Sequence, residues 1–248
     1  MNKILSKRLN FFLSHLAISF FIALIVVGVV FFIWYPSPLA KAVGVTHIFL
    51  MMLAIDVIIG PLLGLLVYKE GKKSLKMDLS IIILIQIIAL GYGVYSIAQG
   101  RPAWLAYNVD RFELVRNNEI VTNQIAQANP QYQQPSWLKP QFIGVEFAKD
   151  KKIRSDDMFA EVLGGISIAQ KPERYVPLDK VKKQMQLRAQ SLGGLNLFNN
   201  KVAVQKILSK YPQATAFVPL KANAVDMSVL INKEKGEVVK IVDLRPWK

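Results

Sequence analysis

The stretch Ile48–Tyr68, IFLMMLAIDVIIGPLLGLLVY, decides the fold of this chain. As an α-helix its 21 residues would span roughly 30 Å, the thickness of the hydrocarbon core of a bilayer. One carboxylate, Asp56, lies near its middle. A charged side chain at that depth costs on the order of 2.5–3.5 kcal/mol. We therefore expect a transmembrane helix whose Asp56 faces protein or water rather than lipid.

Small residues mark the helix-packing side of this stretch. Gly60 and Gly64 follow Asp56 by one and two turns, and glycines at that spacing let another helix approach closely. Pro61 has no N–H to donate to the carbonyl of Val57, so a free acceptor is expected beside the aspartate. We predict that one face of the helix combines a polar notch with a flat packing surface.

Two further apolar stretches flank this one. Leu16–Trp34 contains one polar side chain, Ser19, and Leu79–Ala98 is interrupted by two serines, a glutamine and glycines. A cleaved signal peptide is the alternative for the first stretch, since Ala40-Lys41-Ala42 resembles a cleavage site, but the run exceeds the usual core of about 7–15 residues. Three spans are therefore predicted within a transmembrane domain of residues 1–100, at about residues 14–34, 48–68 and 79–98.

Charge predicts the orientation of these spans. The formal net charge is +14, and lysine and arginine gather before the first span and in the 69–78 loop. Cytoplasmic loops of membrane proteins are rich in these residues. We expect both segments in the cytoplasm and residues 101–248 outside, in the periplasm of a bacterium. That part holds 23 basic against 14 acidic residues, a basic face directed away from the cytoplasm that does not indicate nucleic-acid binding.

Residues 101–248 are predicted to form a small extracytoplasmic α+β domain with an antiparallel sheet. Alternating runs near Met227–Ile231 and Val238–Leu244 predict a hairpin. Apolar residues at helical spacing over Leu178–Leu192 predict a helix that ends at a glycine pair. Residues 117–141 are rich in Asn, Gln and Pro and predict a loop.

Aromatic residues mark the expected membrane boundaries. Tryptophan and tyrosine are enriched where the hydrocarbon meets the headgroups. Each candidate adjoins the end of a predicted span. The predicted interface anchors are Trp34, Tyr35, Tyr68 and Trp104.

Asp56 needs a partner at its own depth in the membrane. It lies twelve residues from the cytoplasmic end of its predicted span, and Gly91 and Tyr92 lie at about that depth in the third. The glycine would allow close approach, and the Tyr92 hydroxyl would reach the carboxylate. Three interpretations stay open, namely an internal fastener, a contact with a partner helix, and a proton or ion path. A path normally needs a second intramembrane ionisable group, which the sequence does not indicate.

No motif indicates catalysis, a metal site or a cofactor. The chain has no cysteine, which excludes disulfides, thiol chemistry and Cys-ligated metals. His15 and His47 lie at the ends of predicted spans and are interpreted as interfacial side chains rather than metal ligands. A single intramembrane aspartate does not form a protease dyad. Asp156-Asp157 is interpreted as a solvated acidic pair.

Several segments of the first half resemble those of a known family. In chain order they are Trp34-Tyr35-Pro36, Asp56-Val57, Gly60-Pro61-Leu62, Lys73–Leu79, Arg101-Pro102 and Asp110-Arg111-Phe112. Together, in this order and spacing, they resemble the TfpX/TfpZ family of type IV pilin accessory proteins, over roughly residues 10–115. No single segment is diagnostic alone.

The resemblance implies a bacterial inner-membrane protein that aids the assembly, stability or display of a major type IV pilin by direct contact. It implies no catalytic residue and no cofactor. The face of Gly60 and Gly64 is then expected to pack on the pilin's apolar helix, and the outer domain to contact the pilin head. Membrane lipid and inner-membrane assembly components are further expected partners. The alternatives are an extracytoplasmic sensor and an envelope enzyme, but the cytoplasmic segments are short and no catalytic cluster is evident.

Overall fold

The structure of the protein, a computed structural model, describes residues 2–248, with side chains from Lys7 onward. The chain folds into two compact units. The span unit consists of the described residues up to Ile33 together with Val45–Gln99. The sheet domain consists of Trp34–Gly44 and Gly100–Lys248. The predicted fold class, three transmembrane helices followed by an α+β domain, is confirmed.

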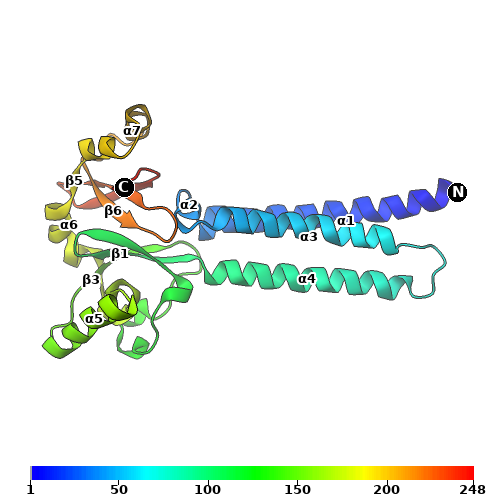
Figure 1. Cartoon of the computed structure of the whole chain (residues 1–248), viewed down its shortest axis with the longest axis horizontal. Coiled ribbons are helices and arrows are strands. Elements are labelled where there is room, and N and C mark those ends of the chain that lie inside the picture. Colours follow the sequence, from blue (N-terminus) through cyan, green and yellow to red (C-terminus); the bar gives the residue numbers. More distant parts are fainter. Residues whose placement is uncertain (1) are drawn as a thin grey trace. The chain divides into compact units, whose positions relative to one another are not determined.

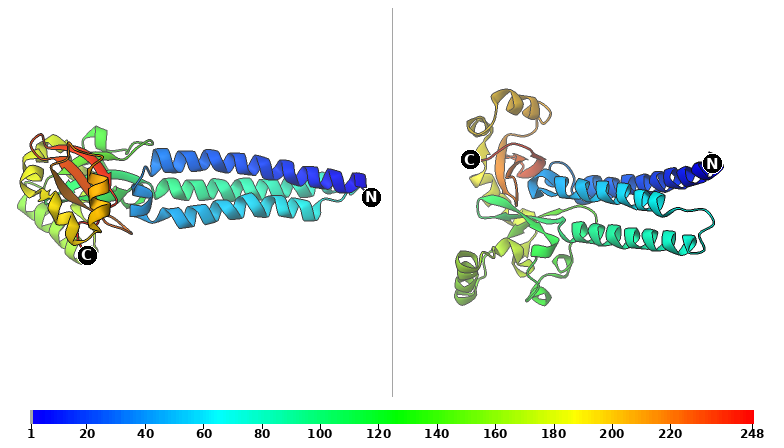
Figure 2. Two further views of the ribbon diagram at one scale, coloured as in Figure 1. Left: turned by 90° about the horizontal axis from the view of Figure 1, so that it is seen from above. Right: turned by 45° about the vertical axis from the view of Figure 1, so that its right-hand side comes forward.

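Three helices build the span unit, and each is long and apolar enough to cross a membrane. They are α1 (Asn2–Gly28), extended to Trp34 by the π-helical η1 (Val29–Trp34), then α3 (Val45–Val67) and α4 (Leu75–Gln99). The helices run side by side, and α3 packs against both of the others (Figure 2). Pro61 lies inside α3, where the neighbouring helices rather than water surround the interrupted backbone.

An eight-stranded sheet forms the sheet domain (Figure 1). Its strand order is β4-β3-β1-β2-β6-β7-β8, and β5 also pairs with β6. The strands are β1 (Pro102–Asn108), β2 (Arg111–Arg116), β3 (Gln141–Val145), β4 (Tyr175–Val176), β5 (Gln190–Ser191), β6 (Ala216–Lys221), β7 (Met227–Asn232) and β8 (Glu237–Val242).

The sheet is mixed, whereas the sequence predicted an antiparallel one. β1 pairs with β3, and β2 with β6, in parallel. In each parallel pair the two strands are distant in the chain and are not joined by a tight turn, so no turn motif in the sequence indicates the pairing. The predicted hairpin is present as β7 and β8, and β1 and β2 also pair antiparallel.

β1 is buried along its whole length because both faces of the sheet are covered. Leu105 and Tyr107 point into a core shared with β2, β6 and β7. Trp104 and Ala106 point to the other side, into a second core. This alternation follows from the two-residue period of a strand.

The segment between the first two spans belongs to the sheet domain rather than forming a plain loop. It contains the short helix α2 (Leu39–Val43), whose Leu39 and Ala42 lie in the first core. The carbonyl of Ala42 accepts hydrogen bonds from Ala224 and Val225 at 2.9 and 3.1 Å. The domain is therefore assembled from two stretches that are separated by two membrane spans.

Three helices and several 3-10 turns complete the domain. The helices are α5 (Lys151–Gly164), α6 (Lys182–Arg188) and α7 (Lys201–Leu208). The 3-10 turns are η2 (Asn117–Glu119), η3 (Ile125–Gln127), η4 (Pro130–Tyr132), η5 (Ile168–Gln170), η6 (Pro172–Arg174), η7 (Leu178–Val181) and η8 (Leu192–Leu197). The helix expected to reach Leu192 ends at Arg188, because Ala189 is extended and β5 begins after it.

Candidate functional site

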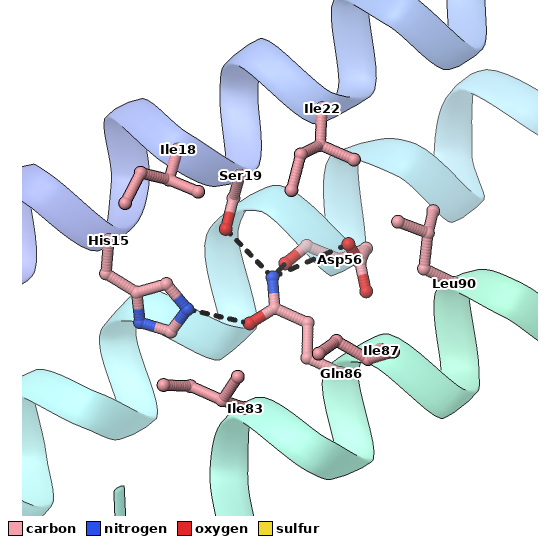
Figure 3. Close-up of a pocket in the computed structure, with 9 residues that line it drawn as sticks. All are labelled: His15, Ile18, Ser19, Ile22, Asp56, Ile83, Gln86, Ile87 and Leu90. Carbon is pink, nitrogen blue, oxygen red and sulfur yellow. Dashed lines mark hydrogen bonds between the residues drawn. The ribbon is translucent and has the colours of Figure 1, made fainter. Parts of the chain in front are cut away.

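A cluster of polar side chains lies inside the span unit, centred on Gln86 of α4 (Figure 3). The Gln86 Oε1 accepts a hydrogen bond from Nε2 of His15 in α1 at 2.9 Å. The Gln86 Nε2 donates to the Oγ of Ser19 at 3.0 Å. It also donates to the backbone carbonyl of Asp56 in α3 at 3.0 Å, with the Asp56 Oδ2 at 3.5 Å. One amide therefore links all three helices.

Gly60 and Gly64 make room for this cluster. A Cβ on Gly60 would collide with the Gln86 amide. A Cβ on Gly64 would lie 2.9 Å from the Phe11 ring and 3.5 Å from Nδ1 of His15. The small-residue face is thus filled by side chains of α1 and α4. The expectation that it receives a pilin helix is corrected accordingly.

A cavity of about 280 Å³ adjoins the cluster. Its walls are isoleucine and leucine side chains of α1 and α4, and its polar lining comes from the four residues above (Figure 3). The Ser19 hydroxyl meets the Gln86 amide rather than a base, so the geometry does not activate it as a nucleophile. The arrangement suits the joining of helices by hydrogen bonds in an apolar medium.

The partner of Asp56 differs from the expected one. Tyr92 is 73% exposed, and a Cβ on Gly91 would meet nothing within 4 Å. Asp56 lies eleven residues before the last residue of α3, and Gln86 lies eleven residues after the first residue of α4. The two therefore share a depth. The predicted third span began at residue 79, four residues after the start of α4, and the prediction therefore paired Asp56 with Gly91 and Tyr92.

His15 was also assigned wrongly. It is only 9% exposed and bonds to Gln86, so it belongs to the bundle interior and not to the membrane boundary. It brings a second ionisable group into the cluster with Asp56, although the uncharged Gln86 amide stands between them. The sequence contained one signal that could have indicated this cluster, since Gln86 is the sole carboxamide in the predicted span 79–98.

The predicted interface anchors divide into two kinds. Trp104 and Tyr35 are each 1% exposed inside the sheet domain, because β1 is covered on both faces and the Trp34–Gly44 segment folds into the same domain. These two predictions are therefore wrong. Tyr68 packs with its ring centroid 5.6 Å from that of Phe11. Trp34 donates from Nε1 to the carbonyl of Trp137 at 3.0 Å.

Helix α5 is fastened to the sheet domain by a buried ion cluster. Its Asp157 is 3% exposed and accepts from Lys171 Nζ and Arg174 Nε, each at 2.7 Å. Burial alone disfavours the ionised carboxylate, but the bonds from Arg174 and Lys171 outweigh it and lower the pKa of Asp157. The interpretation of Asp157 as a solvated residue is wrong, whereas its neighbour Asp156 is exposed.

The outer side of α5 is apolar and exposed. Phe159, Val162 and Leu163 have 61%, 80% and 80% of their surface exposed and stand at i, i+3 and i+4. The helix is well formed at both ends, since the Asp150 side chain caps it and Gly165 closes it in the left-handed conformation. A stable helix whose apolar side is not covered by any of the described residues is typical of a surface that binds another protein.

Comparison with known proteins decides the family. The family model for fimbrial assembly protein FimB matches residues 3–44. Two fimbrial assembly proteins of Dichelobacter nodosus, those of serogroups E1 and I, are each 31% identical over 229 residues, which cover 88% of this chain and 88% of each relative. This chain belongs to the fimbrial assembly protein family. The predicted relationship to type IV pilus accessory proteins is confirmed.

Other comparisons agree in part. The fimbrial assembly protein of serogroups C1 and C2 of the same organism is 34% identical over 116 residues, 46% of this chain and 88% of that relative. No solved structure matches this chain. The fimbrial assembly family is named for assembly, and it is not an enzyme class.

The Asp110-Arg111-Phe112 segment has a structural role in this member of the fimbrial assembly family. Phe112 lies in the first core, and Arg111 donates from Nε to Asp110 Oδ1 at 2.8 Å while its guanidinium lies 5.4 Å from the centroid of the Trp247 ring. Within residues 2–248, no group of three or more His, Asp or Glu is placed to hold a metal ion.

Proposed function

We propose that this protein is an inner-membrane accessory protein of type IV fimbriae that assists assembly by direct contact with its major pilin. The support is the likeness to proteins named for fimbrial assembly over 88% of both chains. The lysine-rich turn between α3 and α4 favours a cytoplasmic location for that turn and a periplasmic location for the sheet domain. Such a domain would meet pilin on the side from which fimbriae extend.

We assign the contact with pilin to the apolar side of α5, and the exposure of that side is the observation that carries this assignment. The Gly60/Gly64 face is already filled within the span unit, so the sheet domain offers the better surface. Phe159, Val162 and Leu163 form the pattern by which an amphipathic helix enters a groove on a partner. Since a few apolar anchors usually supply most of the binding energy, each should contribute more than about 1 kcal/mol.

The test replaces two anchors together, as Val162→Ser with Leu163→Ser, in the full-length protein. Both side chains are exposed, so the variant should accumulate to the normal level while surface fimbriae and co-purified pilin fall at least about tenfold. The matched control is Leu187→Ser with Val202→Ser, because these residues are similarly exposed on α6 and α7. If both variants form surface fimbriae equally and capture pilin as the wild type does, α5 is not the contact with pilin.

A further inference from the structure

A short loop of the sheet domain, Ser136–Lys139, exposes two large apolar side chains. Trp137 is 64% exposed and Leu138 is 66% exposed, and both lie outside the cores of the domain. Single exposed apolar residues are common on protein surfaces and need no explanation. The pair Trp137 and Leu138 needs an explanation because its loop is bonded to residues at the ends of two membrane spans.

The loop is held by residues at the ends of two membrane spans. Trp34 is the last residue of the first span, and its Nε1 donates to the carbonyl of Trp137 at 3.0 Å. Arg101 follows Gln99, the last residue of the third span, by two positions. Its guanidinium lies 4.4 Å from the centroid of the Trp137 ring, and its Nη2 donates to the carbonyl of Ser136 at 3.4 Å.

Connectivity limits how far this loop can be from the lipid. Two residues extend the chain by at most about 7 Å, which is close to the thickness of one headgroup layer. Trp34 and Arg101 are therefore both tied to the boundary of the hydrocarbon, and Trp137 contacts both. The surroundings of a side chain at that level are headgroups and the upper part of the acyl chains.

The side chains of the loop match that environment. The indole of Trp137 is the group most typical of the membrane boundary, since it has an apolar body and one N–H. Leu138 adds apolar surface of the kind that enters the acyl boundary. Lys139 is exposed and supplies positive charge next to the layer of lipid phosphates, whereas Arg101 is buried and holds the Trp137 ring.

We propose that the Ser136–Lys139 loop is a lipid-binding surface of the sheet domain, in which Trp137 and Leu138 enter the headgroup layer of the outer leaflet. Lys139 pairs there with anionic lipid phosphate. The sheet domain thus touches the bilayer through a segment far from the spans in sequence, and its aromatic anchor is Trp137 rather than Trp104.

The absence of cysteine allows a direct test with single labels. Leu138→Cys in the full-length protein is labelled with an environment-sensitive dye and reconstituted into vesicles of phosphatidylethanolamine and phosphatidylglycerol. Leu187→Cys, on an exposed site of α6, is the control. The label at 138 should shift to the blue, lose fluorescence with lipids brominated near the headgroup, and resist quenching by aqueous iodide. The label at 187 should show no blue shift, keep its fluorescence with brominated lipids and be quenched by aqueous iodide.

A second variant tests the charge. Lys139→Glu, combined with Leu138→Cys, should lose part of the blue shift in these anionic vesicles and none in vesicles of phosphatidylcholine. Iodide quenching at 138 equal to that at 187, with no effect of brominated lipid, would overturn the proposal. A label that is shielded in native membranes but open to iodide in the pure lipid vesicles would overturn it too, in favour of a protein on this loop.

Discussion

The span unit and the sheet domain distribute polar and apolar side chains in opposite ways. Outward-facing residues of the span unit are large and apolar, as in Phe21 and Leu66, while its interior contains the amide of Gln86. The sheet domain instead buries aromatic side chains such as Trp104 and Phe112. Lipid surrounds the first unit, so burying apolar surface provides little drive there, and hydrogen bonds and close packing select the arrangement. Water surrounds the second, so the hydrophobic effect dominates.

Substitutions in the buried polar clusters of the two units have different consequences. In the sheet domain, Asp157 is held by Lys171 and Arg174, so removing one partner strands the others away from water. In the span unit, the Gln86 amide shares hydrogen bonds with His15, Ser19 and Asp56, and the membrane-unfolded chain finds substitute partners. The comparison predicts large effects in the ion cluster and smaller ones in the amide cluster.

The largest effect is expected for Asp157→Ala, which leaves Lys171 and Arg174 without their carboxylate. We expect a loss of roughly 3–5 kcal/mol in the free energy of unfolding, or roughly 10 °C in Tm, because two partly buried cations lose their anion. Asp156→Ala is the matched control, since that neighbour is exposed and should change stability by less than about 0.5 kcal/mol. Thermal unfolding of the full-length protein in detergent, with tryptic cleavage in α5 as a local readout, measures both.

The same ion cluster has a defined pH dependence. Because the pKa of Asp157 is lowered on folding, its contribution is fully present above the unfolded value of about 3.9 and disappears as the pH falls through the folded value. The stability gap between the wild type and Asp157→Ala should therefore be constant above about pH 4 and narrow as the pH falls below it. A gap that stays constant below that pH as well would show that the charge is not what stabilises α5.

An intermediate effect is expected for Gly60→Leu in the span unit. The added side chain must displace the Gln86 amide, and overpacking of this kind typically costs about 1–3 kcal/mol. Gly91→Leu introduces the same side chain where nothing lies within 4 Å and should be close to neutral. Unfolding of the two variants by SDS in mixed micelles compares them. Equal behaviour would mean that the glycines of α3 do not set helix packing.

The smallest effect is expected for Gln86→Leu. Its hydrogen bonds to His15, Ser19 and Asp56 lie within the membrane, where such bonds contribute about 0.6 kcal/mol and at most about 1.7. Tyr92→Phe, which removes the hydroxyl at the position first expected to matter, should have no measurable effect. A double-mutant cycle of Gln86→Leu with Ser19→Ala isolates one bond, and strict additivity would show that the two residues do not interact.

The sequence alone determined the three spans, the α+β class of the remainder, the β7–β8 hairpin and the family relationship. Hydropathy and turn chemistry are local properties, so a single stretch such as Ile48–Tyr68 predicts its own secondary structure without knowledge of its neighbours in space. The sequence also singled out Asp56 as the polar point of the second span, although not its partner.

Only the tertiary structure decided which residues meet. The partner of Asp56 depends on where α4 begins, and a shift of four residues exchanged Tyr92 for Gln86. The burial of Trp104 follows from the parallel pairing of β1 with β3, and such pairings join segments that no local pattern connects. In the same way, Trp34 and Trp137 are 103 positions apart in the chain but are joined by a hydrogen bond, and no local sequence pattern indicates that contact.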